Sequence, residues 1–188
     1  KSPNIILVGE KVGHLKKLKR LQEEFGITIA VLGGMPSILS TEYLVDELEK
    51  AFDIKEKNVH LITLVDYNPS SAIIYQTFMA QLRHEGIKNL VSVAHLLTPD
   101  SFTKEELSNV TDQIAVTSPA DKTKLKKWLD AGNGVDFGDG IKLPLGIETE
   151  ALILDFDKLK RLFVHELDKI NSGNFSTINF DELEFISI

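Results

Sequence analysis

The chain has 188 residues, with 28 Asp and Glu against 21 Lys and Arg for a net charge of -7, 43% hydrophobic residues and no cysteine. This length and composition predict one globular domain with a substantial core, and they exclude a mainly disordered chain. The lack of cysteine excludes disulfide frameworks, zinc ribbons, iron–sulfur clusters and thiol catalysis. The negative charge argues against a nonspecific nucleic-acid coat, but it is compatible with a local basic groove.

No apolar run approaches the roughly 20 residues that span a bilayer, and the first apolar stretch is too short for a signal-peptide core. We therefore expect no membrane partner, and a location in the cytoplasm or with the DNA of a nucleoid or nucleus. The first residue is Lys1 rather than Met, and from this start we expect a piece of a longer protein whose partner domains lie elsewhere.

Short apolar runs alternate with longer amphipathic stretches through the first half of the chain, a pattern typical of βα units around a mainly parallel sheet. Strands are predicted at residues 4–8, 27–32, 59–65 and 90–94. Helices are predicted at residues 13–25, 40–52 and 69–85. We expect Ser40 to cap the second helix, and we expect Gly26 to end the first. The predicted fold class is α/β, a Rossmann-like, mainly parallel sheet of about four strands flanked by helices.

The second half of the chain has a weaker pattern, which predicts a mixed extension of the sheet domain. Further helices are predicted at residues 104–109, 121–131 and around 159–167, with a turn-rich surface loop at 132–140. We assign residues 1–170 to one domain. Residues 171–188 form a tail that ends in an apolar segment, Leu183 to Ile188, able to pack or to pair as an edge strand.

Polar side chains follow three of the predicted strands at their carboxyl ends. Glu10 follows the first strand, Gly33 and Gly34 the second, and Asp66-Tyr67-Asn68 the third. Ligands of open α/β sheets bind at such strand ends, near a change in strand order. Oxygen ligands there suit Mg²⁺, which takes one or two carboxylates and completes its shell with water and phosphate oxygens. Glu10, Asp66 and the amide oxygen of Asn68 are therefore the candidate metal ligands.

Four segments in this order resemble the Toprim domain of the topoisomerase VI A subunit and the related meiotic double-strand-break protein. Glu10 resembles the family's glutamate after its first strand, and Gly34-Met35-Pro36-Ser37 resembles its short Gly-x-Pro turn. Asp66-Tyr67-Asn68-Pro69-Ser70 resembles its Asp-x-Asp-Pro-x-Gly motif. The segment 146–152 resembles the region where the family places an acidic residue before Ala-Leu and a closing helix. The resemblance covers residues 4 to 170 and implies a Toprim-like fold.

The resemblance implies roles for these residues in phosphoryl transfer on DNA. Glu10 would be the catalytic general acid/base or a metal ligand, and Asp66 and Asn68 would hold Mg²⁺. We expect DNA-backbone contacts from the cationic residues that follow the glutamate: Lys11, His14, Lys16 and Lys17. A second basic cluster lies at residues 122–127.

The chain departs from the family pattern at two positions and lacks one of its catalytic groups. Asn68 stands where the family usually has Asp, and Ser71 where it usually has Gly. The first departure puts two-metal chemistry in question. The family's nucleophilic tyrosine lies on a winged-helix domain that precedes Toprim, and Tyr43, Tyr67 and Tyr75 do not match its position. We therefore assign no covalent step to this chain, and we expect the tyrosine from a missing N-terminal domain or a partner subunit.

Each candidate also has a structural interpretation. Asp66 or Asn68 can cap the helix that begins at Pro69, with Asn68 the better placed of the two. Gly33 and Gly34 can serve only to turn the chain, and lysine-rich helix faces are commonly solvated surfaces. His60 and His95, in or beside apolar strands, are expected to be hydrogen-bonded in the core rather than to bind zinc.

Three functions stay open on the sequence alone. The first is a Mg²⁺-dependent Toprim domain that binds DNA and supports cleavage by a tyrosine from elsewhere. The second is a catalytically degenerate Toprim scaffold for dimerisation, as a homodimer, or for protein docking. The third is an unrelated α/β binding domain, which a large separation between Glu10 and Asp66 would favour.

Overall fold

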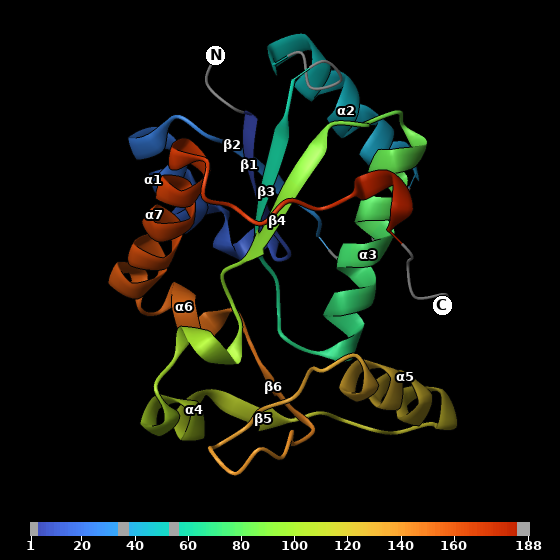
Figure 1. Ribbon diagram of the computed structural model, residues 1–188, viewed down its shortest axis with the longest axis vertical. Coiled ribbons are helices and arrows are strands. Elements are labelled where there is room, and N and C mark those ends of the chain that lie inside the picture. Colours follow the sequence, from blue (N-terminus) through green and yellow to red (C-terminus); the bar gives the residue numbers. More distant parts are fainter. Residues whose placement is uncertain (1–3, 34–37, 53–56, 184–188) are drawn as a thin grey trace.

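Four apolar runs form the strands of one parallel sheet, as predicted, in a computed structural model that describes residues 4–33, 38–52 and 57–183 (Figure 1). The strands are β1 (Asn4–Gly9), β2 (Thr28–Val31), β3 (Val59–Leu64) and β4 (Leu90–His95). Their order across the sheet is β2-β1-β3-β4, and every neighbouring pair is parallel. The α/β class and the parallel sheet of four strands are therefore confirmed.

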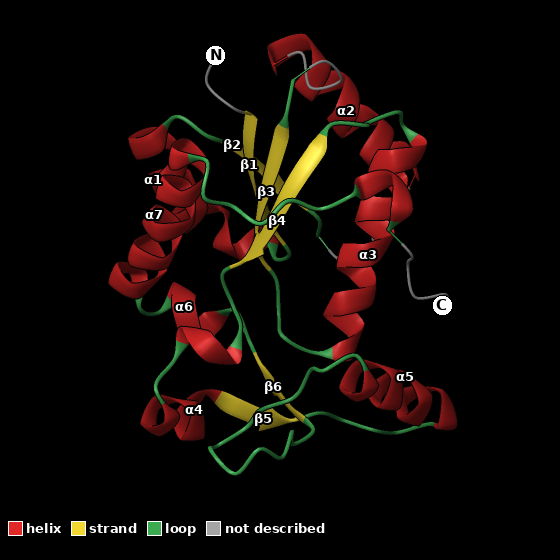
Figure 2. Cartoon of the chain, viewed as in Figure 1, coloured by secondary structure: helices red, strands yellow, loops and turns green. Residues whose placement is uncertain are grey.

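Helices cover both faces of this sheet, as Figure 2 shows. They are α1 (Leu15–Phe25) and α7 (Phe156–Ser172) on one face, and α2 (Ile38–Phe52) and α3 (Pro69–His84) on the other. The side chains of a strand alternate between the two faces. Leu7 of β1 accordingly packs in one cluster with Phe163 of α7, and Ile6 in the other with Phe78 of α3. Both faces of the strands are covered, which explains why their sequences are almost continuously apolar.

The ends of these helices follow from single residues. Gly26 ends α1 in the left-handed conformation, with φ of 64°, as its position after the helix predicted. Asn68 is the N-cap of α3, since its side chain accepts a hydrogen bond from the Ser71 N–H. The prediction that Ser40 caps the second helix is wrong. Because α2 already includes Ile38, Ser40 lies within the helix.

A smaller layer lies beyond the carboxyl ends of the large sheet (Figure 1). It contains α4 (Lys104–Val110), β5 (Thr111–Gln113), α5 (Pro119–Asp130), β6 (Leu145–Ile147) and α6 (Glu150–Ile153). The two helices α4 and α5 confirm predictions, whereas the antiparallel pair of β5 and β6 was not predicted. The described residues also include two isolated antiparallel bridges, one between Tyr67 and Ile147 and one between Val135 and Leu143. The first bridge attaches the smaller layer to the segment that follows β3.

The tail returns from α7 toward the large sheet. The N–H of Ile178 donates to the carbonyl of Val91 in β4 over 2.9 Å, and the Phe180 ring is buried in the short 3-10 helix η3 (Phe180–Glu182). Most of the predicted apolar edge segment, residues 184–188, lies outside the described residues. Among the helices that the structure describes, none is long and apolar enough to cross a membrane.

Candidate functional site at the carboxyl edge of the sheet

The candidate site lies where the strand order changes. From β1 the chain crosses to β2 on one side and later returns to β3 on the other, so the segments that follow β1 and β3 diverge. Such a point is where open α/β sheets bind ligands. Glu10 directly follows β1, and Asp66 follows β3 by two residues. Because β1 and β3 are neighbouring parallel strands, their carboxyl ends lie side by side. Two candidate residues that are 56 positions apart in sequence are therefore brought together.

The Glu10 carboxylate joins the end of β1 to the start of α3. Its Oε2 accepts a hydrogen bond from the backbone N–H of Asp66 over 2.9 Å. Its Oε1 accepts from the Ser71 hydroxyl, also over 2.9 Å. Each oxygen of a carboxylate has two acceptor positions, so Glu10 keeps capacity for a further ligand. The carboxylate is thus held in one place and is still able to bind a cation.

The Asp66 side chain points toward a different segment, the one that leads into α6. Its Oδ1 accepts the backbone N–H of Thr149 over 2.8 Å and lies 3.2 Å from Nζ of Lys11. Only 11% of the Asp66 side chain is exposed. Thr149 is fully buried. These contacts fix the orientation of the Asp66 carboxylate.

Lys11 links Asp66 to Glu150, the first residue of α6. Its Nζ lies 2.9 Å from both carboxylate oxygens of Glu150. Burial alone would lower the pKa of Lys11, but hydrogen bonds and charges from Glu150 and Asp66 outweigh burial, so this pKa is raised. Burial alone would raise the pKa of Glu150, but the hydrogen bonds it accepts from Lys11 and the backbone, together with the nearby Lys11 charge, outweigh burial, so this pKa is lowered. The ion pair is therefore held in its charged form.

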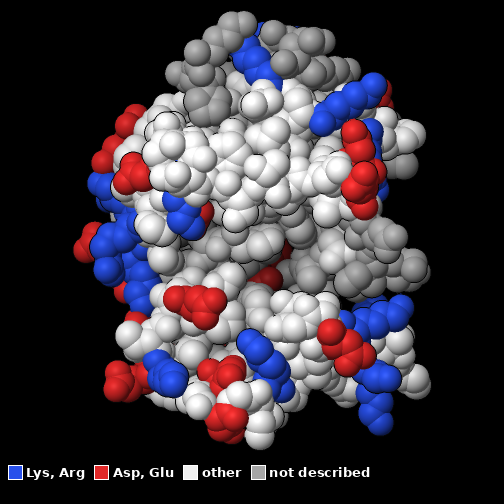
Figure 3. Space-filling view, in the orientation of Figure 1, with Lys and Arg blue, Asp and Glu red and all other residues white. Residues whose placement is uncertain are grey.

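His14 completes the cluster from the 3-10 helix η1 (Val12–His14). Its Nε2 lies 3.3 Å from Oε1 of Glu150, and its Nδ1 lies 3.4 Å from the Thr149 hydroxyl. Two of the four residues predicted to contact DNA, Lys11 and His14, thus lie beside carboxylates. The other two are on α1, where Lys16 is exposed and Nζ of Lys17 lies 5.7 Å from the centre of the Phe156 ring. Lys and Arg side chains gather on this side of the molecule, over α1 and α7 (Figure 3).

Asn68, the third predicted metal ligand, has a structural role. Its Oδ1 accepts the N–H of Ser71 over 2.8 Å and so caps α3. An amide oxygen has a second acceptor position, so capping does not prevent it from binding a metal ion as well. The prediction that Asn68 rather than Asp66 caps this helix is confirmed.

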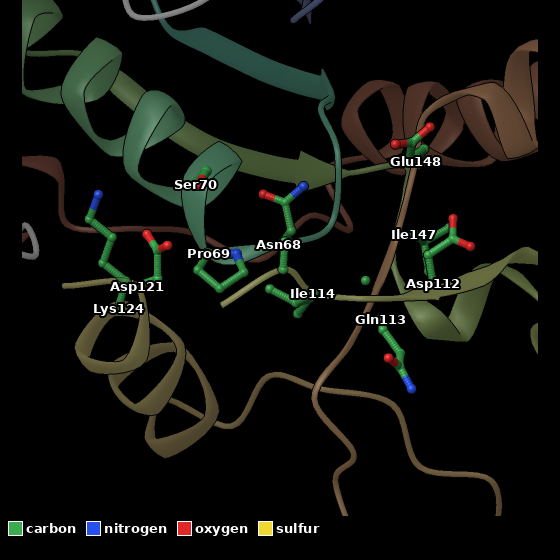
Figure 4. Close-up of a pocket in the computed structure, with 12 residues that line it drawn as sticks. Asn68, Pro69, Ser70, Asp112, Gln113, Ile114, Asp121, Lys124, Ile147 and Glu148 are labelled. Atoms are coloured by element: carbon green, nitrogen blue, oxygen red, sulfur yellow. The ribbon is translucent and has the colours of Figure 1, made fainter. Parts of the chain in front are cut away.

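Two cavities adjoin Asn68. One has a volume of about 310 Å³ and separates the start of α3 from β5 and α5. Figure 4 shows Asn68 and Pro69 along one wall, with Gln113 and Ile114 from the β5 strand and the segment after it, and Asp121 and Lys124 from α5. The other, of about 250 Å³, is lined by Asp66 together with aromatic residues that include Tyr67, Tyr75 and Trp128. Asp66 and Asn68 therefore border open space, whereas Glu10 lines neither of these two cavities.

Two site residues were not predicted from the sequence. Glu150 and Thr149 come from the segment 146–152, which carried part of the family resemblance but to which no role was assigned. The acidic residue in that segment was the available signal. Its approach to Lys11 depends on a contact across 139 positions of sequence, which no local pattern indicates.

The donor atoms at this site suit Mg²⁺. Over residues 4–33, 38–52 and 57–183, no group of three or more Asp, Glu or His side chains is arranged to hold a metal ion. Mg²⁺, however, needs only one or two protein carboxylates when phosphate oxygens and water supply the remainder. Glu10 and Asp66 provide two such carboxylates, so the residues fit this ion by chemistry and number.

Comparison with known proteins adds no family to this description. No protein-family model matches the chain, and no curated protein matches its sequence. The functional interpretation therefore depends on the residues at the carboxyl edge of the sheet.

Proposed function

We propose that this chain is a Mg²⁺-dependent, Toprim-like domain of a topoisomerase VI A-like DNA-cleaving protein. One observation carries the proposal. The Glu10 carboxylate accepts a hydrogen bond from the Asp66 backbone across the change in strand order, so that the two acidic segments meet. The large separation of Glu10 and Asp66 that would favour an unrelated binding domain is therefore not observed.

In this proposal the chain positions a DNA phosphate and a metal ion, and another domain or subunit supplies the attacking tyrosine. Glu10 acts as general acid/base or as a metal ligand, and Asp66, with Asn68 beside it, holds the metal. When bound, Mg²⁺ stabilises the charge that develops on the phosphate oxygens. His14, Lys16 and Lys17 provide cationic contacts for the DNA backbone.

A metal titration of this chain tests the proposal. We expect Mg²⁺ to shift the backbone amide signals of Glu10, Asp66 and Asn68 in NMR spectra, with millimolar affinity in the absence of DNA and higher affinity when a short duplex is added. Asp66→Asn keeps an oxygen that can accept the Thr149 N–H but removes the charge, so the response should be lost. Asp168→Asn, which removes a charge from an exposed position on α7, is the matched control.

Two results of this titration would contradict the proposal. If neither the free chain nor the chain with duplex DNA responds to Mg²⁺ up to about 10 mM, metal-dependent chemistry at this site is wrong. If Asp168→Asn weakens the response as much as Asp66→Asn, the response comes from general charge rather than from the Glu10–Asp66 pair.

A second function, a degenerate Toprim scaffold for dimerisation or docking, is favoured by one specific observation. The two residues that depart from the family motif both have structural partners: Asn68 caps α3 through the Ser71 N–H, and the Ser71 hydroxyl binds Glu10. A motif used to hold the sheet to α3 does not need a metal ion. A stable homodimer in sedimentation, together with no Mg²⁺ response, is the expected outcome for this scaffold.

A further inference from the structure

The ammonium of Lys11 already occupies a cation position between two carboxylates. Its Nζ is within 3.2 Å of three oxygens, both from Glu150 and one from Asp66. These carboxylates come from segments far apart in sequence, one after β3 and one at the start of α6. The contact is thus a product of the fold and not of a local helix pairing.

Asp66 is common to this arrangement and to the proposed metal site. A divalent ion bound by Asp66 requires the same charge that Lys11 now neutralises, and two cations cannot both approach one carboxylate closely without strong repulsion. Lys11 also directly follows Glu10, the other proposed ligand. We infer that Lys11 is a built-in competitor of the metal ion, whose ammonium must leave Asp66 before Mg²⁺ binds there. This inference depends on the proposed metal site.

The structure gives the Lys11 side chain room to leave. Its side chain is 31% exposed, and its backbone is extended, with φ of -104° and ψ of 125°, between the end of β1 and η1. A long, unbranched side chain in this position can turn toward solvent without a change in the strand. Glu150, 40% exposed, can keep contact with His14 after Lys11 moves.

Displacement of Lys11 also links metal binding to DNA binding. While Nζ is held by Glu150 and Asp66, it is not available to a phosphate. Once a divalent ion replaces it at Asp66, the ammonium is free to approach a phosphate oxygen bound to that same ion. The metal and the DNA would therefore favour each other's binding, because each stabilises the arrangement in which Lys11 has left the carboxylates.

Removal of the ammonium tests the inference. We expect Lys11→Met, which keeps the apolar stem but removes the charge, to bind Mn²⁺ about tenfold more tightly than the natural chain in calorimetric titrations. The reason is that the natural chain binds only in the minority state in which Lys11 is displaced, and its apparent affinity falls by that fraction. Lys11→Arg keeps a competing cation and should bind weakly. Lys19→Met removes an equal charge from an exposed position on α1 and should leave the affinity unchanged.

A measurement on the natural chain avoids any dependence on how well the variants fold. Addition of Mg²⁺ should shift the side-chain CεH₂ signal of Lys11 in NMR spectra, because its ammonium leaves two carboxylates. An unmoved Lys11 signal during saturable binding, or equal Mn²⁺ affinity of Lys11→Met and the natural chain, overturns the competition and leaves the proposed metal site intact. If neither Lys11→Met nor the natural chain binds Mn²⁺, both the competition and the proposed metal site are wrong.

Discussion

Asn68 stabilises the start of α3 by capping the helix. The four N-terminal N–H groups of a helix lack partners within the helix, and Asn68 satisfies one of them through the Ser71 N–H. Pro69 follows it and needs no partner, since proline has no N–H. The amide of Asn68 therefore has a structural reason to be present that is independent of any metal ion.

We expect Asn68→Ala to lower the free energy of unfolding by about 1 kcal/mol, the usual cost of losing an N-cap. Asn68→Asp should keep the natural stability, because aspartate caps as well as asparagine and its charge favours the N-terminus of the helix. Urea denaturation of the three proteins measures both values. Equal stability of the alanine variant would contradict the capping role, and a large loss in the aspartate variant would show that charge at this edge is not tolerated.

At the residue level, the sequence predicted the part of the site that depends on strand ends. Glu10 and Asp66 could be placed together because parallel strands end at the same edge of a sheet. The partners of those residues could not be predicted. Lys11 was assigned to DNA, but its ammonium lies against Asp66 and Glu150. This contact depends on how α6 packs rather than on any spacing in the sequence.

At the scale of elements, β6 delivers Thr149 and Glu150 to the site. The strand is only three residues long, but two backbone hydrogen bonds join Ile147 to Tyr67, with N–O distances of 2.8 and 3.0 Å. Tyr67 lies between Asp66 and Asn68 in sequence. This bridge therefore holds the segment before α6 against the segment after β3, and Asp66 can reach the Thr149 N–H.

The close approach of these two segments requires glycine at position 146. A Cβ atom there would lie 2.8 Å from the Tyr67 carbonyl oxygen, a backbone atom that cannot turn aside. We expect Gly146→Ala to destabilise the fold by about 1 to 3 kcal/mol, as overpacking commonly does, with amide NMR shifts centred on Tyr67 and Thr149. Thermal and urea unfolding measure the loss.

Gly13→Ala is the matched control, because a Cβ atom at that position meets nothing within 4 Å. It should leave stability nearly unchanged. If Gly146→Ala is as stable as Gly13→Ala, the bridge between Tyr67 and Ile147 is looser than the structure indicates.

The elements that could be predicted are those long enough to show a period. The strands of the large sheet have four to six residues of mostly apolar sequence, and α1 repeats its apolar residues at helical spacing. In contrast, β5 has the sequence Thr-Asp-Gln, with no apolar residue to suggest a strand. It forms because β6 lies beside it, a tertiary effect that no local propensity reveals.

At the scale of the whole molecule, the sheet buries a titratable side chain near the amino end of β3. His60 of β3 is 3% exposed, and its Nδ1 lies 2.7 Å from the Ser92 hydroxyl on the neighbouring strand. The ring of Phe175, from the segment after α7, packs edge-on against it at 4.6 Å between ring centres. His60 therefore joins β3, β4 and the tail.

This burial makes the stability of the whole fold depend on pH. Burial lowers the pKa of His60 below its ordinary value of 6.5, so in the window below pH 6.5 the unfolded chain binds the proton more readily than the folded one. The neutral imidazole makes its full contribution to the free energy of unfolding above about pH 6.5. This contribution is lost as the pH falls toward the pKa of His60 in the folded chain. The natural chain should thus lose stability relative to His60→Asn as the pH falls from 7.5 to 5. Because all other groups titrate in both proteins, the difference between their urea unfolding free energies isolates the contribution of His60.

His165→Asn, at an exposed position on α7, controls for the loss of an imidazole. If the difference in unfolding free energy between the natural chain and His60→Asn stays constant with pH, burial does not keep His60 neutral.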